Sequence, residues 1–201
     1  MIGIYVNRTD LFMEAPLNQP TPAPTGDADV VREPLTSDGP IDFTLIELLF
    51  FSYREFTADA DMLLERYHFG RAHHRVLHFV NRDPGMTIAD LLDLLQITKQ
   101  SLSRVLRQLI EGGFVTQQAG TDDRRQRHLY PTPAGRALTL ELSRAQVRLI
   151  EAAKKASVAS HEGFDIASVA EFLFQMAMES GSTRRWYKKQ GIGGKACYDP
   201  G

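Results

Sequence analysis

The 201-residue chain is long enough for one globular domain with extensions, and its 43% hydrophobic and 24% charged residues are ordinary for a soluble protein. The apolar run at residues 43–51 is far shorter than the roughly 20 residues of a membrane span, and the N-terminus has no basic and apolar leader, so neither a membrane protein nor a secreted protein is expected. A single cysteine, Cys197, excludes an internal disulfide framework and fits a cytoplasmic location.

The net charge of −2 hides an uneven distribution along the chain. Residues 1–42 hold seven acidic and two basic side chains, a net charge of −5. Residues 71–136 hold ten basic and six acidic side chains, a net charge of +4, together with four of the six histidines. The middle of the chain is therefore the part expected to meet an anionic partner.

Residues 1–41 are rich in Pro, Thr and Asp. This segment is predicted to be disordered because it cannot bury enough apolar surface, and the predicted helices and strands follow it. Helices are predicted at residues 42–66, from Gly70 to the sequence NRDPG, from Thr87 to Leu95, and from Thr98 to Glu111. Two strand-like runs follow at 114–118 and 127–132, where Pro131 predicts an early end to the second strand. Further helices are predicted at 133–158 and 165–180, before a basic, Gly-rich tail at 181–201.

Two short helices, a three-residue turn and a β-hairpin predict a winged helix-turn-helix, mainly α with a small β-wing. On the second short helix one stripe is apolar and the opposite stripe is polar, basic and free of acidic residues. The polar stripe and the first turn contain Lys99, Gln100, Ser101, Ser103, Arg104 and Arg107. These side-chain types suit base edges in the major groove, and the alternative is a solvated amphipathic face.

The loop between the strands is the second candidate site. It places Arg124, Arg125 and Arg127 at a hairpin tip, where an arginine can enter a narrow minor groove. Asp123 can hold a neighbouring guanidinium in a bidentate pair. The alternative is a soluble turn whose charges partly cancel.

The stretch ITKQSLSRVLRQLIEGGFVTQQAGTDDRRQRHLYPTPAG resembles the DNA-binding core of MarR-type transcriptional regulators. Leu109, Gly113 and Val115 match the family's pattern at the end of its recognition helix. The wing pattern Asp-x-Arg and the Thr-x-x-Gly element are matched by Asp123, Arg125, Thr132 and Gly135. The Lys-Gln-Ser-Leu start of the helix is similar to a PetP-like branch of the family. The likeness covers about residues 42–180, and its specific part is residues 86–136.

The resemblance implies a homodimeric regulator that binds a pseudo-palindromic site in double-stranded DNA. It implies base or phosphate contacts from the polar stripe, and minor-groove insertion of Arg125 with Asp123 as its support. It also implies a DNA-binding lobe at about 70–132 and dimerisation helices at about 42–66, 133–158 and 165–180. Members of the family usually bind small aromatic effectors, so an effector stays open as a further partner.

Other signals are weaker. His68, His73, His74 and His78 cluster, and His74 and His78 lie one helical turn apart, but no local carboxylate or cysteine completes a zinc site, so no metal is expected. Cys197 is expected to be inert, and residues 184–189 either contact phosphate, pack on the dimer or form a solvated tail. No catalytic motif, catalytic residue or cofactor is identified. The rival hypothesis is a winged-helix protein-interaction module without sequence-specific DNA binding.

Overall fold

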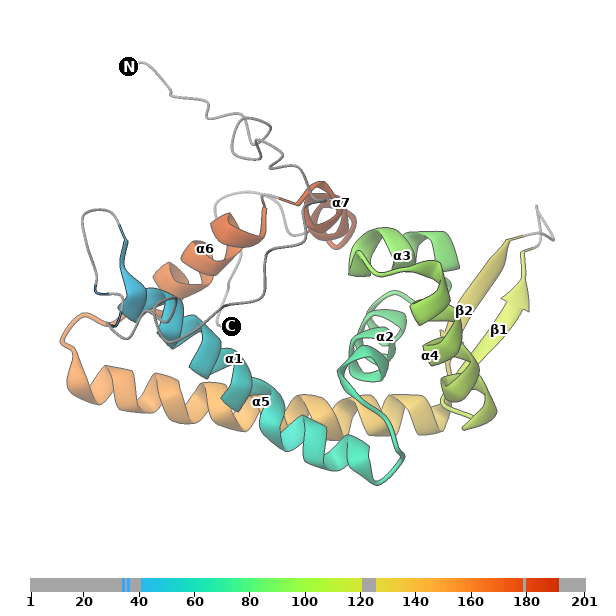
Figure 1. The fold of residues 1–201 in the computed structure, drawn as a ribbon, viewed down its shortest axis with the longest axis horizontal. Coiled ribbons are helices and arrows are strands. Elements are labelled where there is room, and N and C mark those ends of the chain that lie inside the picture. Colours follow the sequence, from blue (N-terminus) through green and yellow to red (C-terminus); the bar gives the residue numbers. More distant parts are fainter. Residues whose placement is uncertain (1–33, 35, 37–40, 121–125, 179, 192–201) are drawn as a thin grey trace, which may run out of the picture. The chain divides into compact units, whose positions relative to one another are not determined.

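The structure is a computed structural model that describes residues 34, 36, 41–120, 126–178 and 180–191. Within these ranges the chain forms seven helices and one two-stranded antiparallel sheet, which confirms a mainly α fold with a small β-wing (Figure 1). The elements are α1 (Phe43–Glu65), α2 (Arg71–Arg82), α3 (Ile88–Leu95), α4 (Lys99–Glu111), β1 (Val115–Ala119), β2 (Arg127–Pro131), α5 (Pro133–Ser160), α6 (Ile166–Ala177) and α7 (Gly181–Lys189). Most of the predicted N-terminal extension, and Cys197, lie outside the described residues.

One hydrophobic core joins α2, α3, α4, the sheet and the first half of α5. Apolar side chains spaced three or four residues apart give each of these helices one buried side. The fully buried members with the largest side chains include Leu77, Leu91, Leu109, Leu129 and Leu142. This core holds the helix-turn-helix and the wing as one unit.

The wing is attached to the loop that precedes α3. Strands β1 and β2 pair from Val115 opposite Pro131 to Ala119 opposite Arg127. On the other side of β2, the Leu129 amide donates to the Met86 carbonyl at 3.0 Å, and the Gly85 amide donates to the Leu129 carbonyl at 2.8 Å. Strand β2 ends at Pro131, one residue before the end of the predicted run at 132, which agrees with the prediction that Pro131 ends the second strand early. A proline is tolerated at this terminal position, where few ladder bonds are lost.

The end of α4 and the start of α5 meet in a tight backbone joint. Gly113 has a φ of 75°, and the amide of Phe114 donates to the Leu109 carbonyl at 2.9 Å, the arrangement of a Schellman helix end. The Thr132 hydroxyl donates to the Gly113 carbonyl at 2.6 Å and accepts from the Gly135 amide at 3.0 Å, which caps α5. A Cβ atom on Gly135 would lie 1.9 Å from the Phe114 carbonyl oxygen, so only glycine fits there.

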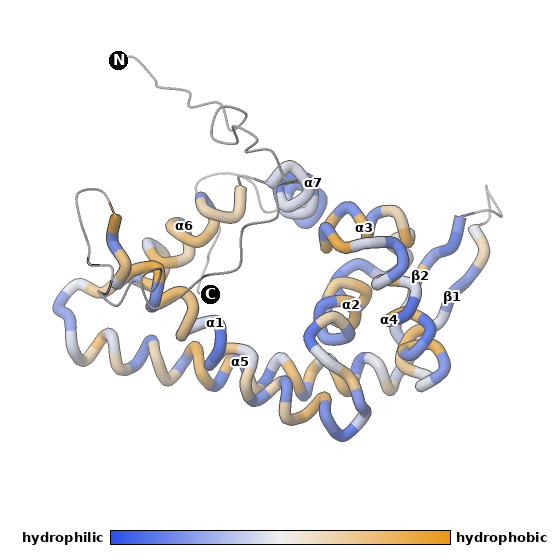
Figure 2. Tube along the Cα trace, viewed as in Figure 1, coloured by the Kyte–Doolittle hydropathy of each residue, from blue (hydrophilic) through white to orange (hydrophobic). Residues whose placement is uncertain are grey.

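Three helical segments keep large apolar side chains on their surface. In α1, buried positions begin only at Thr57; in α5 they end at Ala145; α6 has none. Phe50 is 68% exposed, Val147 is 54% exposed and Leu173 is 49% exposed. Figure 2 shows the apolar residues along α1 and α6. None of the described helices is both long enough and apolar enough to cross a membrane.

The predicted basic tail contains a helix that the sequence patterns did not reveal. Helix α7 carries Arg184, Arg185, Lys188 and Lys189, and it packs on α3 through a partly buried Trp186. Two of its aromatic residues make ring contacts, Trp186 with Phe79 of α2 and Tyr187 with Phe174 of α6.

We expect Gly135→Ala to lower the free energy of unfolding by at least about 2 kcal/mol, because the new methyl group meets backbone atoms that cannot rotate away. Urea denaturation followed by circular dichroism measures this loss. The matched control is Gly70→Ala, where the added Cβ has no atom within 4 Å and the expected loss is below about 1 kcal/mol. Equal losses in the two variants would contradict the backbone joint.

Candidate nucleic-acid interface

The helix-turn-helix begins with a reciprocal cap on α3. Thr87 Oγ1 accepts from the Asp90 amide at 3.1 Å, and the Thr87 amide donates to Asp90 Oδ2 at 3.0 Å. Burial opposes ionisation of Asp90, but its hydrogen bonds with Thr87 outweigh burial and lower the pKa of this carboxyl group. At the other end, Gln96 adopts a left-handed conformation with a φ of 51°, which turns the chain toward α4. The cap and turn predicted from the sequence are therefore present.

Helix α4 is capped and then divided into two faces. Thr98 Oγ1 accepts from the Ser101 amide at 3.1 Å, and the Thr98 hydroxyl donates to Ser101 Oγ at 2.9 Å. Leu102, Val105, Leu106 and Leu109 are buried in the core. The six predicted contact residues are all exposed: Lys99, Gln100, Ser101, Ser103, Arg104 and Arg107. In the part of the chain that the structure describes, Lys99, Arg104 and Arg107 take part in no ion pair. The face thus presents three cations that no carboxylate of the described residues neutralises.

A contact from α2 holds the side of this helix. His73 Nδ1 accepts from the Gly70 amide at 3.1 Å, so a neutral His73 ring carries its proton on Nε2 and donates to Gln108 Oε1 at 3.0 Å. The ring also stacks on Phe69, with centroids 4.6 Å apart. Together these contacts fix α4 to the start of α2. The sequence placed His73 in a histidine cluster but gave no indication of Gln108 as its partner.

A surface hollow of about 280 Å³ lies beside that contact. Its lining combines the α1–α2 loop and α2 with the exposed side of α4: His68, His73, Ser101, Arg104, Val105 and Gln108. Two of the predicted contact residues, Ser101 and Arg104, therefore border one concave and polar surface. Such a surface can accept an anionic group such as a phosphate.

The wing residues are only partly described. Arg127 is exposed at the start of β2, opposite Ala119, and it makes no ion pair with the rest of the described chain. Asp123, Arg124 and Arg125 lie outside the described residues. The two strands pair in antiparallel fashion as far as Ala119 and Arg127.

The predicted histidine cluster is divided by the fold. His74 and His78 are largely buried on α2, and burial is the main cause that lowers the pKa of both rings. The negative charge of Asp61 in α1 partly opposes the lowering of the His74 pKa. His74 and Arg82 lower the pKa of His78 further. Among the residues described, no three His, Cys, Asp or Glu side chains gather closely enough to hold a metal ion.

The arrangement of capped helices, sheet and exposed basic face defines a winged helix-turn-helix protein. A family model described as MarR family matches residues 69–126. The chain is 48% identical over 134 residues to the HTH-type transcriptional regulator PetP of Rhodobacter capsulatus, an alignment that covers 66% of this chain and 80% of the relative. The chain belongs to the MarR family, and it is accordingly a transcriptional regulator and not an enzyme.

Solved structures have the same fold. The crystal structure of MarR is 20% identical, with a TM-score of 0.56, and the match covers 75% of this chain and 98% of that one. The Streptococcus pneumoniae protein FabT, solved in complex with DNA, is 19% identical with a TM-score of 0.54, and the match covers 67% of this chain and 94% of that one. A MarR family regulator from Listeria monocytogenes, complexed with a 26mer DNA, is 18% identical with a TM-score of 0.52, over 75% of this chain and 97% of that one.

The lowered pKa values of His74 and His78 predict a loss of stability in mild acid. Below about pH 6.5 the unfolded chain binds protons at these residues, while the folded chain binds them less readily, so the free energy of unfolding falls as pH falls. The urea midpoint of the wild type should therefore decrease between pH 7.5 and pH 5.5. In His74→Gln/His78→Gln this decrease should be less than half as large. His161→Gln, at an exposed residue, should retain the full decrease, and an undiminished decrease in the double variant would contradict the assignment.

Proposed function

We propose that the protein is a sequence-specific double-stranded DNA-binding regulator that acts as a homodimer on a pseudo-palindromic site. The observation that carries this proposal is the exposed, acid-free face of α4, whose cations have no carboxylate partner in the described chain. Such a face costs electrostatic free energy through self-repulsion and recovers it on contact with phosphates and base edges. The DNA complexes formed by FabT and by the Listeria regulator, which have the same fold, support the proposal.

Helix α4 is the proposed major-groove reader. Lys99, Gln100 and Ser101 occupy its first turn, the part that usually reaches base edges. Arg104 and Arg107 follow on the same side, where a guanidinium can bind guanine O6 and N7 or a phosphate. Ser103 directly precedes Arg104 and supplies a hydroxyl group. The wing is the proposed minor-groove reader, with Arg125 inserted, Asp123 as its support, and Arg124 and Arg127 near the phosphates.

The apolar surfaces of α1, α5 and α6 support a homodimer. Each carries exposed large side chains such as Phe50, Val147 and Leu173, and soluble monomers rarely leave such patches uncovered. A two-fold axis through these helices would place two copies of α4 about 34–36 Å apart, one turn of the double helix. A small-molecule effector that favours another spacing would then regulate the dimer by a population shift. The proposed location is the cytoplasm.

The rival function is docking of another protein on the winged helix. The mixed charge of the chain, with a net of −2, motivates it. The two functions differ in their response to salt, because release of counterions from DNA gives a steep and linear dependence of log affinity on log salt concentration. Selection of bound fragments from a random duplex pool, followed by titration at two salt concentrations, separates them. Failure to enrich any duplex sequence at low salt would refute the regulator.

We expect Arg104→Ala to weaken binding to the selected duplex by roughly 5-fold to 150-fold, since one base-edge pair contributes about 1–3 kcal/mol of discrimination. Preference at one base pair should relax at the same time. Fluorescence anisotropy with the selected duplex and with single-base variants measures both. Arg148→Ala removes an exposed arginine of α5 that pairs at 3.9 Å with Asp59, and it should change affinity less than threefold. A uniform loss across all sequences would reassign Arg104 to phosphate.

Leu173→Lys should convert the dimer to a monomer, because it places a charge within the exposed apolar side of α6. Analytical ultracentrifugation gives the mass, and anisotropy should show at least a tenfold loss of affinity for the complete site. Glu171→Lys inserts the same charge on the opposite side of α6 and should leave the dimer intact. A dimeric Leu173→Lys protein would exclude α6 from the interface.

A further inference from the structure

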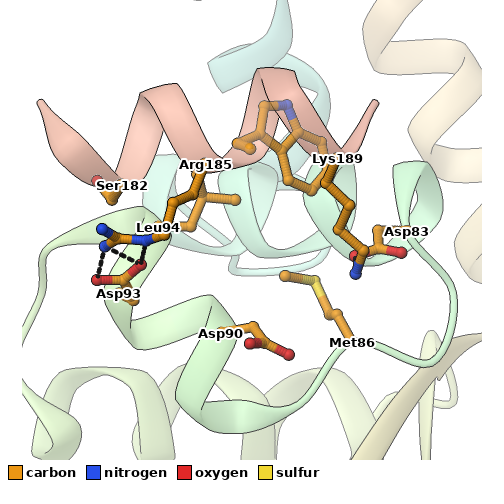
Figure 3. A pocket seen from close by; sticks show the side chains of 9 residues that line it. Asp83, Met86, Asp90, Asp93, Leu94, Ser182, Arg185 and Lys189 are labelled. Atoms are coloured by element: carbon orange, nitrogen blue, oxygen red, sulfur yellow. Dashed lines mark hydrogen bonds and ion pairs between the residues drawn. The ribbon is translucent and has the colours of Figure 1, made fainter. Parts of the chain in front are cut away.

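Helix α7 follows α6 in the chain and connects it to the helix-turn-helix through contacts with α3. It begins at Gly181, four residues after α6 ends at Ala177, and it lies along α3 (Figure 3). Between these helices remains a small cleft of about 110 Å³. The cleft is bordered by the end of α2, the loop to α3, and α3 itself on one side, and by α7 on the other.

Two ion pairs hold the polar side of this contact. Arg185 binds Asp93 of α3 through both carboxylate oxygens, with Nη2 at 2.7 Å from Oδ1 and 2.6 Å from Oδ2, and with Nε at 3.2 Å from Oδ2. These hydrogen bonds raise the pKa of Arg185 further above its usual value. Lys189 pairs with Asp83, which ends α2. Figure 3 shows the guanidinium of Arg185 directed at Asp93 and the Lys189 side chain reaching Asp83.

An apolar contact and a buried hydroxyl complete the attachment. The ring of Trp186 meets Phe79 of α2 edge to face, with centroids 5.0 Å apart, and Trp186 packs against the main core. Ser182 is 5% exposed, and its Oγ lies 2.8 Å from Ser180 Oγ. Arg185, Trp186 and Lys189 of α7 thus contact the proposed DNA-reading unit, residues 71–131, while Tyr187 packs on Phe174 of α6.

The charges of α7 argue against a role as a phosphate-binding tail. Arg185 and Lys189 are neutralised by the two aspartates, while Lys188 makes no ion pair or hydrogen bond in the described part of the chain. Arg184 donates to the Met178 carbonyl at 2.9 Å, so three of the four cations make internal contacts, two of them as ion pairs. An exposed ion pair contributes little to global stability.

We infer that α7 is a clasp that fixes the orientation of the helix-turn-helix relative to α6, and that Arg185, Trp186 and Lys189 are positioning residues for α4. The inference rests on the proposed homodimer. The DNA-reading unit is also attached through the α1–α2 loop, through the joint at Thr132 and Gly135, and through the core packing of α1 and α5. A further attachment to α3 removes rotational freedom that these leave. In a dimer, that freedom would appear as variable spacing between the two copies of α4.

The direct test measures that spacing by pulsed electron paramagnetic resonance. The full chain, with Cys197→Ser and a nitroxide attached through Glu111→Cys at the exposed end of α4, carries one label per subunit. Arg185→Asp should at least double the width of the distance distribution between the two labels. Lys188→Asp, with the same change of charge on the same helix, should leave the width unchanged. The exchange Asp93→Arg/Arg185→Asp should restore the narrow distribution.

A second readout uses DNA. The selected duplex is altered by one or two base pairs inserted between its half-sites. We expect the wild type and Lys188→Asp to lose at least tenfold in affinity for the altered duplexes, and Arg185→Asp to lose less than threefold. Circular dichroism and thermal denaturation establish that each variant is folded. If Arg185→Asp does not fold, the milder variant Arg185→Ala replaces it in both measurements.

The outcomes separate the two proposals. One outcome overturns the clasp alone. In it, the wild type enriches DNA and gives an inter-label distance, but Arg185→Asp matches Lys188→Asp in both readouts. A wild type with no inter-label distance overturns the homodimer and the clasp together, because α7 then has no spacing to set. Broadening in Arg185→Asp that the charge exchange reverses supports the clasp.

Discussion

The contact between the backbone of Gly135 and the carbonyl group of Phe114 is the constraint on which the arrangement of this chain depends. Phe114 connects α4 to the wing, and Gly135 lies in the first turn of α5, which leads toward the apolar surfaces proposed for dimerisation. Because no side chain fits between them, α5 leaves the DNA-reading unit in one direction. The Thr132 hydroxyl secures this direction by binding Gly113 and Gly135 at once.

This joint explains two sequence patterns that look independent. The pattern of Leu109, Gly113 and Val115 ends one helix, and the Thr-x-x-Gly element of Thr132 and Gly135 begins another. In the structure the two are halves of one contact. The local rules for helix caps predicted each half correctly, since a cap depends on residues only three or four positions apart. The contact between the halves could not be predicted, because nothing in either pattern specifies its partner.

The same division between local and distant interactions applies to the candidate site. The exposed stripe of α4 and the caps at Thr87 and Thr98 follow from periodicity and side-chain chemistry, and the structure has them at the predicted residues. The bond between His73 and Gln108 joins residues 35 positions apart, and the pair of Arg185 and Asp93 spans 92 positions. Such pairs depend on how helices pack in three dimensions. No spacing rule along one chain can identify them.

The distribution of carboxylates decides what each group of cations does. Helix α4 has three cations and, until Glu111 at its end, no acidic residue, so its charge stays available to an external anion. Helix α7 has four cations, but two of them are neutralised by ion pairs with Asp83 and Asp93. The number of basic residues is similar in the two helices, yet α4 is proposed to bind DNA and α7 to fix the orientation of α4. The difference lies in the neighbours that the fold supplies, and the two proposed roles are complementary, because in the proposed dimer an exposed basic face fits successive grooves only if its direction is fixed.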